Sequence, residues 1–327
     1  MKLKSLAELL PAAVTRSGAA GSPEYYNNLV ANGFGPGWAR PERSLWPVPE
    51  SKFLPAVWRY SDAKTALNLA GQYVPMHLTE RRNLLMINPR AGNLYPTVSN
   101  LVAAYQMIQP GETADDHRHT PHALRVVIDC SAGVYTVVNG ERVDMTPDDL
   151  VFTPGGFWHG HANESEQCAY WIDVLDVPLV HHLESMFFEQ NPQGFRRPER
   201  LAIDSTLRIP LSRAATAAVT PGVATATLPS HLPTMSLELL KLDSGAHTVL
   251  SRCSANMLLI VLSGTCDVQV EGEISAPGCL RGDLVAIPLW KWHSIAAREP
   301  TCVLCISDQP IYEQLGYFRT ETRNSEP

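Results

Sequence analysis

Four histidines occur as two pairs whose spacing suits metal binding. His117 and His119 are separated by one residue, and so are His159 and His161. Residues two apart on a β-strand point to the same face, so each pair would present two imidazoles together. Arg125 would join the first pair if its strand continues without a bulge. Neutral imidazoles at close range are the usual ligands of a divalent transition metal. The pattern indicates a metal site inside a barrel; the alternative is a set of hydrogen-bonded core histidines.

The elements that would position these residues are short strands. From Asn100 onward, β-branched runs alternate with turn signals, and Asn139-Gly140 between residues 135–138 and 142–145 is typical of a type I′ hairpin. A second block, residues 234–307, repeats this punctuation at a similar spacing. Two copies of a strand-rich unit of roughly 100 residues predict two antiparallel barrels or jelly rolls. The predicted fold class is therefore all-β.

Helical signals are confined to three segments. Residues 1–14 favour a short amphipathic helix over a signal peptide, because Glu8 and Pro11 interrupt the apolar stretch. Helices are also expected at 62–70 and at 178–190. We predict four regions along the chain: a partly helical N-terminal arm at 1–90, a metal-binding β-domain at 91–190, a linker at 191–233 and a structural β-domain at 234–327.

The composition excludes several classes of protein. The 327 residues carry 26 Lys+Arg and 33 Asp+Glu, a formal net charge of −7. The sequence has no apolar run of about 18 residues, the length that would predict a membrane span. It also has no Lys/Arg-rich block that would favour nucleic acid as a partner. Seven scattered cysteines are typical of reduced thiols, not of a disulfide framework. We expect a cytoplasmic protein that binds a small molecule.

At the histidine pairs the sequence resembles the cupin superfamily. The first cupin motif, G-x5-H-x-H-x(3–4)-E-x6-G, matches at its first glycine and its two histidines; Ala123 and Leu124 stand at the possible places of its glutamate, and its last glycine comes later, at Gly133. The second, G-x5-P-x-G-x2-H-x3-N, matches except at its leading glycine, where Asp148 stands. The matching residues are Gly111, His117, His119 and Gly133 in the first motif and Pro154, Gly156, His159 and Asn163 in the second.

Without the motif glutamate, the chain is similar to the gentisate 1,2-dioxygenase group of cupins, which includes the salicylate and 1-hydroxy-2-naphthoate dioxygenases. The similarity covers nearly the whole chain, including Trp58-Arg-Tyr60, Glu80-Arg-Arg82, Asn88-Pro89, Trp171-Ile-Asp173, Leu175-Asp-Val-Pro178 and Ser307-Asp-Gln-Pro310. It implies a bicupin fold, a homotetramer and one Fe(II) per chain in the first cupin domain. The implied iron ligands are His117, His119 and His159.

The resemblance also implies a substrate pocket for a small aromatic hydroxy acid. Arg125 and His161 match positions that hold the acid and the reacting oxygen. The smaller side chain of Val102, where some relatives carry an aromatic residue, leaves room for a ring substituent. The other implied pocket residues are Arg81 for the carboxylate (Arg82 if the register shifts by one), Gln106, Ala104 and Asn83.

Three neutral imidazoles agree with this chemistry, because a 2+ ion that takes roughly six ligands keeps about three positions open. The carboxylate and phenolate oxygens of a 2-hydroxybenzoate can fill two of them and dioxygen the third, which brings the reactants together. We therefore predict an Fe(II)-dependent dioxygenase that inserts O2 between the carboxyl-bearing and hydroxyl-bearing carbons. Gentisate and a 5-substituted salicylate, such as a nitro- or halosalicylate, are the expected substrates.

Other interpretations stay open at this point. The chain could be a non-catalytic cupin that binds an aromatic acid, or a metal-dependent isomerase or decarboxylase. Arg125 could be a structural ion-pair partner, His161 a rim histidine and Arg81 a solvated arginine. His122 has the strand parity opposite to the first histidine pair, so we expect it to face outward or to lie on a bulge.

The second block lacks the metal-binding pattern. Ser251 and Cys253 stand where the first block carries its histidine pair, and only His293 remains. One imidazole and one thiol cannot reproduce a three-histidine site. We expect this block to have a structural role.

Overall fold

The computed structural model describes residues 21–39, 44–75, 82–202, 204–271 and 274–323, and the chain forms two compact units. The first unit, residues 1–50, contains the α-helix α2 (Pro23–Ala31) and the 3-10 helix η1 (Gly37–Ala39). The Ser22 hydroxyl oxygen caps α2 by accepting a hydrogen bond from the backbone N–H of Tyr25. The predicted helix at 1–14 lies outside the described residues.

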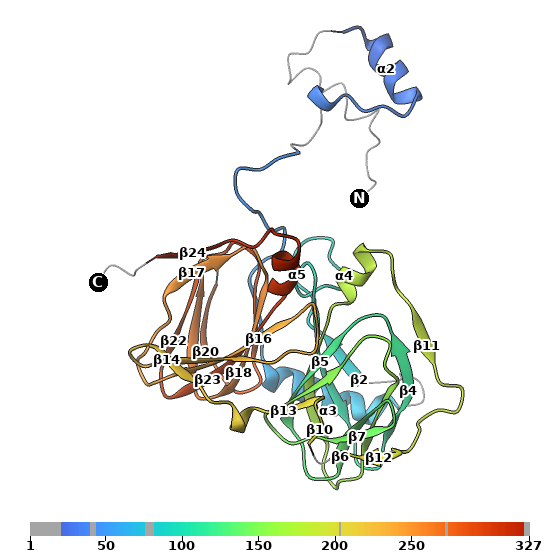
Figure 1. Cartoon of the computed structure of the whole chain (residues 1–327), viewed down its shortest axis with the longest axis vertical. Helices are drawn as coiled ribbons and strands as arrows, with labels where there is room; N and C mark the ends of the chain where they lie inside the picture. Colours follow the sequence, from blue (N-terminus) through green and yellow to red (C-terminus); the bar gives the residue numbers. More distant parts are fainter. Residues whose placement is uncertain (1–20, 40–43, 76–81, 203, 272–273, 324–327) are drawn as a thin grey trace. The chain divides into compact units, whose positions relative to one another are not determined.

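The second unit, residues 51–327, begins with a barrel of two six-stranded sheets (Figure 1). The first inner sheet has the order β13 (Arg208–Pro210), β8 (Asp149–Thr153), β5 (Ala123–Asp129), β10 (Ala169–Leu175), β3 (Val102–Ile108) and β2 (Arg82–Leu85). The first outer sheet has the order β11 (Phe188–Gln190), β4 (Thr113–His119), β9 (His159–Asn163), β6 (Val134–Val138), β7 (Glu141–Asp144) and β12 (Arg200–Leu201).

A second barrel repeats this plan with a seven-stranded and a five-stranded sheet. The second inner sheet has the order β1 (Ala56–Trp58), β21 (Leu284–Ile287), β18 (Met257–Ser263), β23 (Thr301–Ser307), β16 (Ser236–Leu242), β15 (Val223–Leu228) and β14 (Ala217–Thr220). The second outer sheet has the order β20 (Ile274–Cys279), β19 (Cys266–Val270), β22 (His293–Ala297), β17 (Leu250–Cys253) and β24 (Thr320–Arg323). The all-β, bicupin prediction is confirmed.

The two inner sheets are buried on both faces, which explains their continuous apolar strands. On β18, Leu258, Ile260 and Leu262 belong to a core shared by both inner sheets. Leu259 and Val261 point the other way, into the interior of the second barrel. The shared core therefore joins the barrels back to back, and each barrel keeps an interior of its own.

The helix α3 (Tyr60–Tyr73) reinforces the junction between the barrels, and it confirms the helix predicted at 62–70. Leu67 of α3 is fully buried in the shared core. The backbone N–H of Tyr60 donates to Asp283 of the second barrel, and its hydroxyl donates to Asp129 of the first, at 2.9 and 2.7 Å. One residue at the start of the helix thus binds both barrels.

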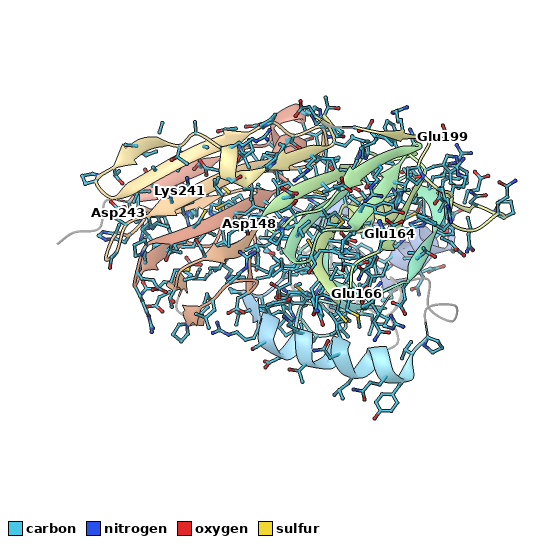
Figure 2. All side chains as sticks on the ribbon, turned by 90° about the horizontal axis from the view of Figure 1, so that it is seen from below. Asp148, Glu164, Glu166, Glu199, Lys241 and Asp243 are labelled. Carbon is cyan, nitrogen blue, oxygen red and sulfur yellow. The ribbon has the colours of Figure 1, made fainter. Side chains whose placement is uncertain are left out.

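An ion pair also crosses the junction, close to Tyr60. Figure 2 labels Asp148 where the two barrels meet, with α3 along the lower edge of the view. The Arg281 guanidinium donates to the Asp148 carboxylate at 2.7 Å and to the backbone oxygen of Ile128 at 2.7 Å. Asp148 also has φ of 67°. It occupies the left-handed conformation that suits the glycine of the cupin motif.

Two local predictions have opposite outcomes. The hairpin is confirmed, because β6 and β7 pair across Asn139 and Gly140, whose φ angles are 46° and 79°. The helix at 178–190 is wrong beyond its first turns, because α4 (Val177–His182) ends there and Glu184 has φ of 55°. Residues 188–190 instead form β11 on the edge of β4. The unpaired backbone of that edge overrides a weak helical pattern.

The remaining short helices are η3 (Leu211–Arg213) and α5 (Gln309–Gln314). Residues 191–233 contribute four strands, β12 to β15, and residues 51–90 contribute β1, α3 and β2. The division of the chain into arm, linker and two cupin domains stays a prediction. Within the part that the structure describes, no helix is long and apolar enough to cross a membrane.

All seven cysteines are free thiols, as the scattered spacing predicted. Cys302 packs on the shared core, whereas Cys305 faces the interior of the second barrel. The two thiols of the C-x-x-C sequence therefore lie on opposite faces of β23, which does not suit a shared zinc ion.

Candidate metal centre and substrate pocket

Three buried histidines converge inside the first barrel. His117 and His119 come from β4, and His159 comes from β9, where it lies directly opposite His117 in the strand register. The ring centroids are 4.2 Å apart for His117 and His159, 4.9 Å for His119 and His159, and 5.6 Å for His117 and His119. One nitrogen from each ring lies within 4.8 Å of the other two. The three side chains form a group that could hold a metal ion.

The backbone fixes the orientation of these rings. In all three histidines, Nδ1 lies 2.8–3.1 Å from a backbone carbonyl oxygen two residues away along the chain. A carbonyl oxygen can only accept, so Nδ1 carries the hydrogen and Nε2 carries the lone pair. A metal-ligating histidine needs this arrangement, in which the second nitrogen is anchored. The donor set is three neutral imidazoles without a carboxylate.

A buried polar network lies beside the histidines. Arg125 on β5 pairs with Asp173 on β10 through Nε to Oδ1 at 2.9 Å and Nη2 to Oδ2 at 3.0 Å. The same guanidinium lies 3.0 and 3.2 Å from the two ring nitrogens of His161. Thr136 on β6 contacts His161 Nδ1 at 2.8 Å. His161 is thus held from both sheets, with its ring 6.0 Å from that of His159.

Asp173 is the site residue to which sequence reasoning gave no role. Its side chain is 1% exposed, and that of Arg125 is 4% exposed. The pair balances its own charge, so the guanidinium is not a free cation waiting for a carboxylate. A signal was available: β10 is otherwise apolar, and an aspartate buried in such a strand requires a partner.

Two polar atoms in this network have no hydrogen-bond partner among the described residues. Gln106 donates through Nε2 to Asp173, but its Oε1 is buried without a donor. Nε1 of Trp171, which lies opposite Gln106 in the strand register, is buried without an acceptor. Arg125 covers the Trp171 ring at 4.7 Å. A bound molecule could supply the missing donor and acceptor.

The other predicted pocket residues lie on β2 and β3. Val102, Ala104 and Gln106 are buried at every second position of β3, so they share one face of the strand. Gln106 on this face contacts Asp173. Asn83 on β2 is exposed and lies opposite Gln106 in the register. The structure therefore brings Val102, Ala104 and Gln106 to the barrel interior and leaves Asn83 at the sheet edge.

The two candidate arginines have different outcomes. Arg81 lies outside the described residues. Arg82 is buried and forms a bidentate pair with Glu112 at 2.6 and 2.7 Å, while its Nε donates to the backbone oxygen of Val74. The Arg82 donors are committed to these partners, so Arg82 is a structural residue. This leaves Arg81 as the arginine in the substrate prediction.

His122 does not belong to the metal-binding group. It lies between β4 and β5, and its Nδ1 accepts a hydrogen bond from the backbone N–H of Gly155 at 2.9 Å. It therefore stabilises the turn before β9. On α4, His181 and His182 are exposed.

The described residues of the second barrel hold no comparable group. Ser251 on β17 lies opposite His293 on β22, as His117 lies opposite His159 in the first barrel. Among the described residues, the only group of three His, Cys, Asp or Glu side chains that could hold a metal ion is the one in the first barrel.

Comparison with known proteins identifies the family. Residues 104–175 match the cupin domain family. The chain is 30% identical to a 5-aminosalicylate 1,2-dioxygenase of Comamonas sp, over 90% of this chain and 89% of the relative. The chain belongs to the gentisate and salicylate 1,2-dioxygenase family. It is 29% identical to a gentisate 1,2-dioxygenase of Streptomyces sp, over 91% of this chain and 94% of that one.

A solved structure of the same family has the same fold. It is the salicylate 1,2-dioxygenase of Pseudoaminobacter salicylatoxidans with gentisate, which superimposes with a TM-score of 0.84 at 27% identity. The match covers 93% of this chain and 95% of that one. Members of this family are ring-cleaving oxidoreductases, so the predicted enzyme class is confirmed.

Proposed function

We propose that this protein is an Fe(II)-dependent dioxygenase that cleaves the ring of gentisate or of a 5-substituted salicylate between the carboxyl-bearing and hydroxyl-bearing carbons. The observation that carries the proposal is the three-histidine group beside the buried pair of Arg125 and His161. Relatives named for gentisate and 5-aminosalicylate, and a family structure with gentisate, support this substrate class.

The fit of ferrous iron rests on the donor set. His117, His119 and His159 would hold the ion through Nε2, because each Nδ1 is committed to a carbonyl oxygen. With no carboxylate ligand, the ion keeps its 2+ charge, which favours an anionic, chelating hydroxy acid. When bound, ferrous iron supplies electron transfer between the aromatic ring and dioxygen and holds the two together.

The protein residues around this site bind and orient the substrate. Arg81 would pair with the substrate carboxylate. Gln106 Oε1 and Trp171 Nε1 offer a buried acceptor and a buried donor to polar groups on the ring. Val102 and Ala104, both small, leave space for a substituent at the 5-position.

His161 would act at the oxygen side of the reaction. Its ring is fixed by Arg125 and Thr136, which contact both ring nitrogens, and a hydrogen bond from His161 to the reacting oxygen would replace one of these contacts. Arg125 acts through His161 and Asp173, and any direct contact with the substrate would use its remaining N–H. In this account the arginine, with its charge balanced by Asp173, positions His161.

The test is oxygen uptake by the full chain after anaerobic loading with Fe(II). Gentisate, salicylate, 5-aminosalicylate, 5-nitrosalicylate and 5-chlorosalicylate would be supplied in turn, and the product would be analysed by mass spectrometry after reaction with ¹⁸O₂. We expect consumption of one O2 per substrate and both oxygen atoms in a ring-opened acid. Release of CO2 without O2 uptake would indicate a decarboxylase, and binding without turnover would indicate a non-catalytic aromatic-acid binder.

A pair of variants sharpens this test. His161→Ala should lower kcat by about 10²–10⁴-fold while iron stays bound. His182→Ala, at an exposed position on α4, is the matched control and should leave kcat unchanged. Unchanged turnover in His161→Ala would remove His161 from the reaction. The predicted homotetramer and cytoplasmic location stay predictions.

A further inference from the structure

The second barrel contains a cavity of about 260 Å³. It opens to solvent, since Val219, Val249 and Thr322 of its lining are exposed. Its volume exceeds the roughly 150 Å³ of an apolar cavity that binds benzene. Strands of both sheets of the barrel line it. The lining includes Glu238, Ser251, His293 and Cys305 among aliphatic and hydroxyl side chains.

This cavity occupies the place that the three-histidine group has in the first barrel. Ser251 and His293 lie opposite each other in the register, as His117 and His159 do. The position is therefore the ligand-binding end of a cupin barrel, although the metal-binding side chains are gone. Among the described residues no three-ligand group is present there. A molecule that binds in this cavity must do so without a metal.

His293 provides a polar anchor in the cavity. It is 8% exposed, and its Nδ1 lies 3.1 Å from the backbone oxygen of Lys291. Because that oxygen only accepts, Nδ1 carries the hydrogen and Nε2 is an acceptor. Burial lowers the pKa of His293, which keeps the ring neutral. In the part of the chain that the structure describes, Nε2 has no hydrogen-bond partner, so a ligand N–H or O–H could supply one.

The charge of the cavity selects against anions. Glu238 is exposed, and it is the one lining residue with a formal charge when His293 is neutral. Most other lining residues are aliphatic side chains and hydroxyls. Burial raises the pKa of the Cys305 thiol, which therefore adds no negative charge. A carboxylate ligand would face Glu238 with no cation in the lining, whereas a neutral ring would bury its faces against aliphatic walls.

We propose that the second barrel binds a small, uncharged aromatic molecule with one hydrogen-bond donor, of the phenol class, in this cavity. The ring packs between the two sheets, and its O–H donates to Nε2 of His293. The site discriminates against the hydroxybenzoates that the first barrel takes, because Glu238 repels their carboxylate. The two barrels thus bind aromatic molecules of different charge.

The experiment uses 4-fluorophenol and 4-fluorobenzoate as probes, followed by ¹⁹F NMR, with the full-length protein under anaerobic conditions. Saturating gentisate is present to occupy the first barrel. We expect saturable binding of 4-fluorophenol and none of 4-fluorobenzoate. Absence of 4-fluorophenol binding would overturn the proposal. So would binding that is seen without gentisate and is lost when gentisate saturates the first barrel.

Four variants locate the site. His293→Leu keeps the volume but removes the acceptor, so the phenol Kd should rise about tenfold. Ser251→Phe fills the cavity and should abolish binding, while His182→Leu, at an exposed histidine, should change nothing. Glu238→Gln should admit 4-fluorobenzoate. Unchanged phenol affinity in both His293→Leu and Ser251→Phe, in protein with the wild-type circular dichroism spectrum, would place the binding elsewhere and refute the proposal.

Discussion

The two barrels share a strand plan but differ in the side chains at matching positions. In the first barrel, Asp173 on β10 lies opposite Arg125 on β5. The corresponding strands of the second barrel, β23 and β18, carry Cys305 opposite Leu259. A buried ion pair in one barrel is therefore a thiol and an aliphatic side chain in the other.

The outer sheets of the two barrels also carry polar side chains in the first and apolar ones in the second. Thr136 lies opposite His161 in the first barrel, and Val268 lies opposite Ile295 in the second. The second barrel still forms a complete set of paired strands with an apolar interior. The fold therefore does not need the polar network, and removing charges from water is costly. This difference agrees with the proposed role of the network in binding and chemistry.

At one position, in contrast, the two barrels have the same side chain in the same geometry. His293 keeps the geometry of His159: in each, Nδ1 lies near the backbone oxygen two residues earlier, at 3.1 and 3.0 Å. The backbone geometry that orients His159 is thus found again at His293 in the second barrel. Orientation of a single histidine is not sufficient for metal binding, since two further imidazoles are needed.

The largest expected effect separates the two barrels by metal content. His119→Ala should abolish iron binding and activity together, because two imidazoles remain. His293→Ala is the matched change in the second barrel and should leave both unchanged. Inductively coupled plasma mass spectrometry and oxygen uptake measure the two quantities. Iron retained by His119→Ala, or iron lost from His293→Ala, would contradict the assignment.

A transplant of the second barrel's residues tests the role of the ion pair. Asp173→Cys alone leaves Arg125 buried without its counter-charge and should lower the free energy of unfolding by about 3–5 kcal/mol. Adding Arg125→Leu reproduces the pair found in the second barrel and should recover most of that loss. Urea denaturation measures both changes.

The double variant, Asp173→Cys with Arg125→Leu, should be inactive even though its stability recovers, because His161 no longer has Arg125 as a hydrogen-bond donor. A double variant less stable than Asp173→Cys would show that the pair stabilises the fold and would break the comparison. A fully active double variant would show that the network has no part in the reaction.

The smallest expected effect concerns the aspartates that follow the last large strand of each barrel. Burial raises the pKa of Asp308 to about 6 and also raises the pKa of Asp176. The folded state of Asp308 then holds a proton that the unfolded chain has already lost above its ordinary pKa of 3.8. Its contribution to stability is complete below that value and is lost as the pH rises through about 6.

The check compares wild type with Asp308→Asn by urea unfolding from pH 4 to pH 7. The stability of wild type relative to the variant should fall over this range, and Asp176→Asn provides the matched measurement in the first barrel. A relative stability that rises with pH would show that the carboxylate is the form that the fold prefers.

Sequence reasoning brought together the three histidines that could hold a metal ion, because a two-residue spacing on strands fixes the face to which side chains point. The type I′ turn at Asn139-Gly140 was predictable for a similar local reason, since both residues accept positive φ. The prediction that the second block has a structural role rests on its residue types, Ser251 and Cys253 in place of a histidine pair.

What the sequence could not supply depends on contacts between distant segments. The pairing of Asp173 with Arg125 joins strands 48 residues apart. β11 forms because the edge of β4 is available, although its own residues, 188–190, lay within a predicted helix. The commitment of Arg82 to Glu112 likewise depends on where two segments meet.

The most direct test of the central claim is a titration of metal-free protein with Fe(II) under anaerobic conditions, with oxygen uptake on gentisate measured after each addition. The account predicts that activity rises linearly and stops rising at one iron per chain, because only the first barrel has three imidazoles. A break at two irons per chain, or no oxygen uptake at full loading, would contradict it.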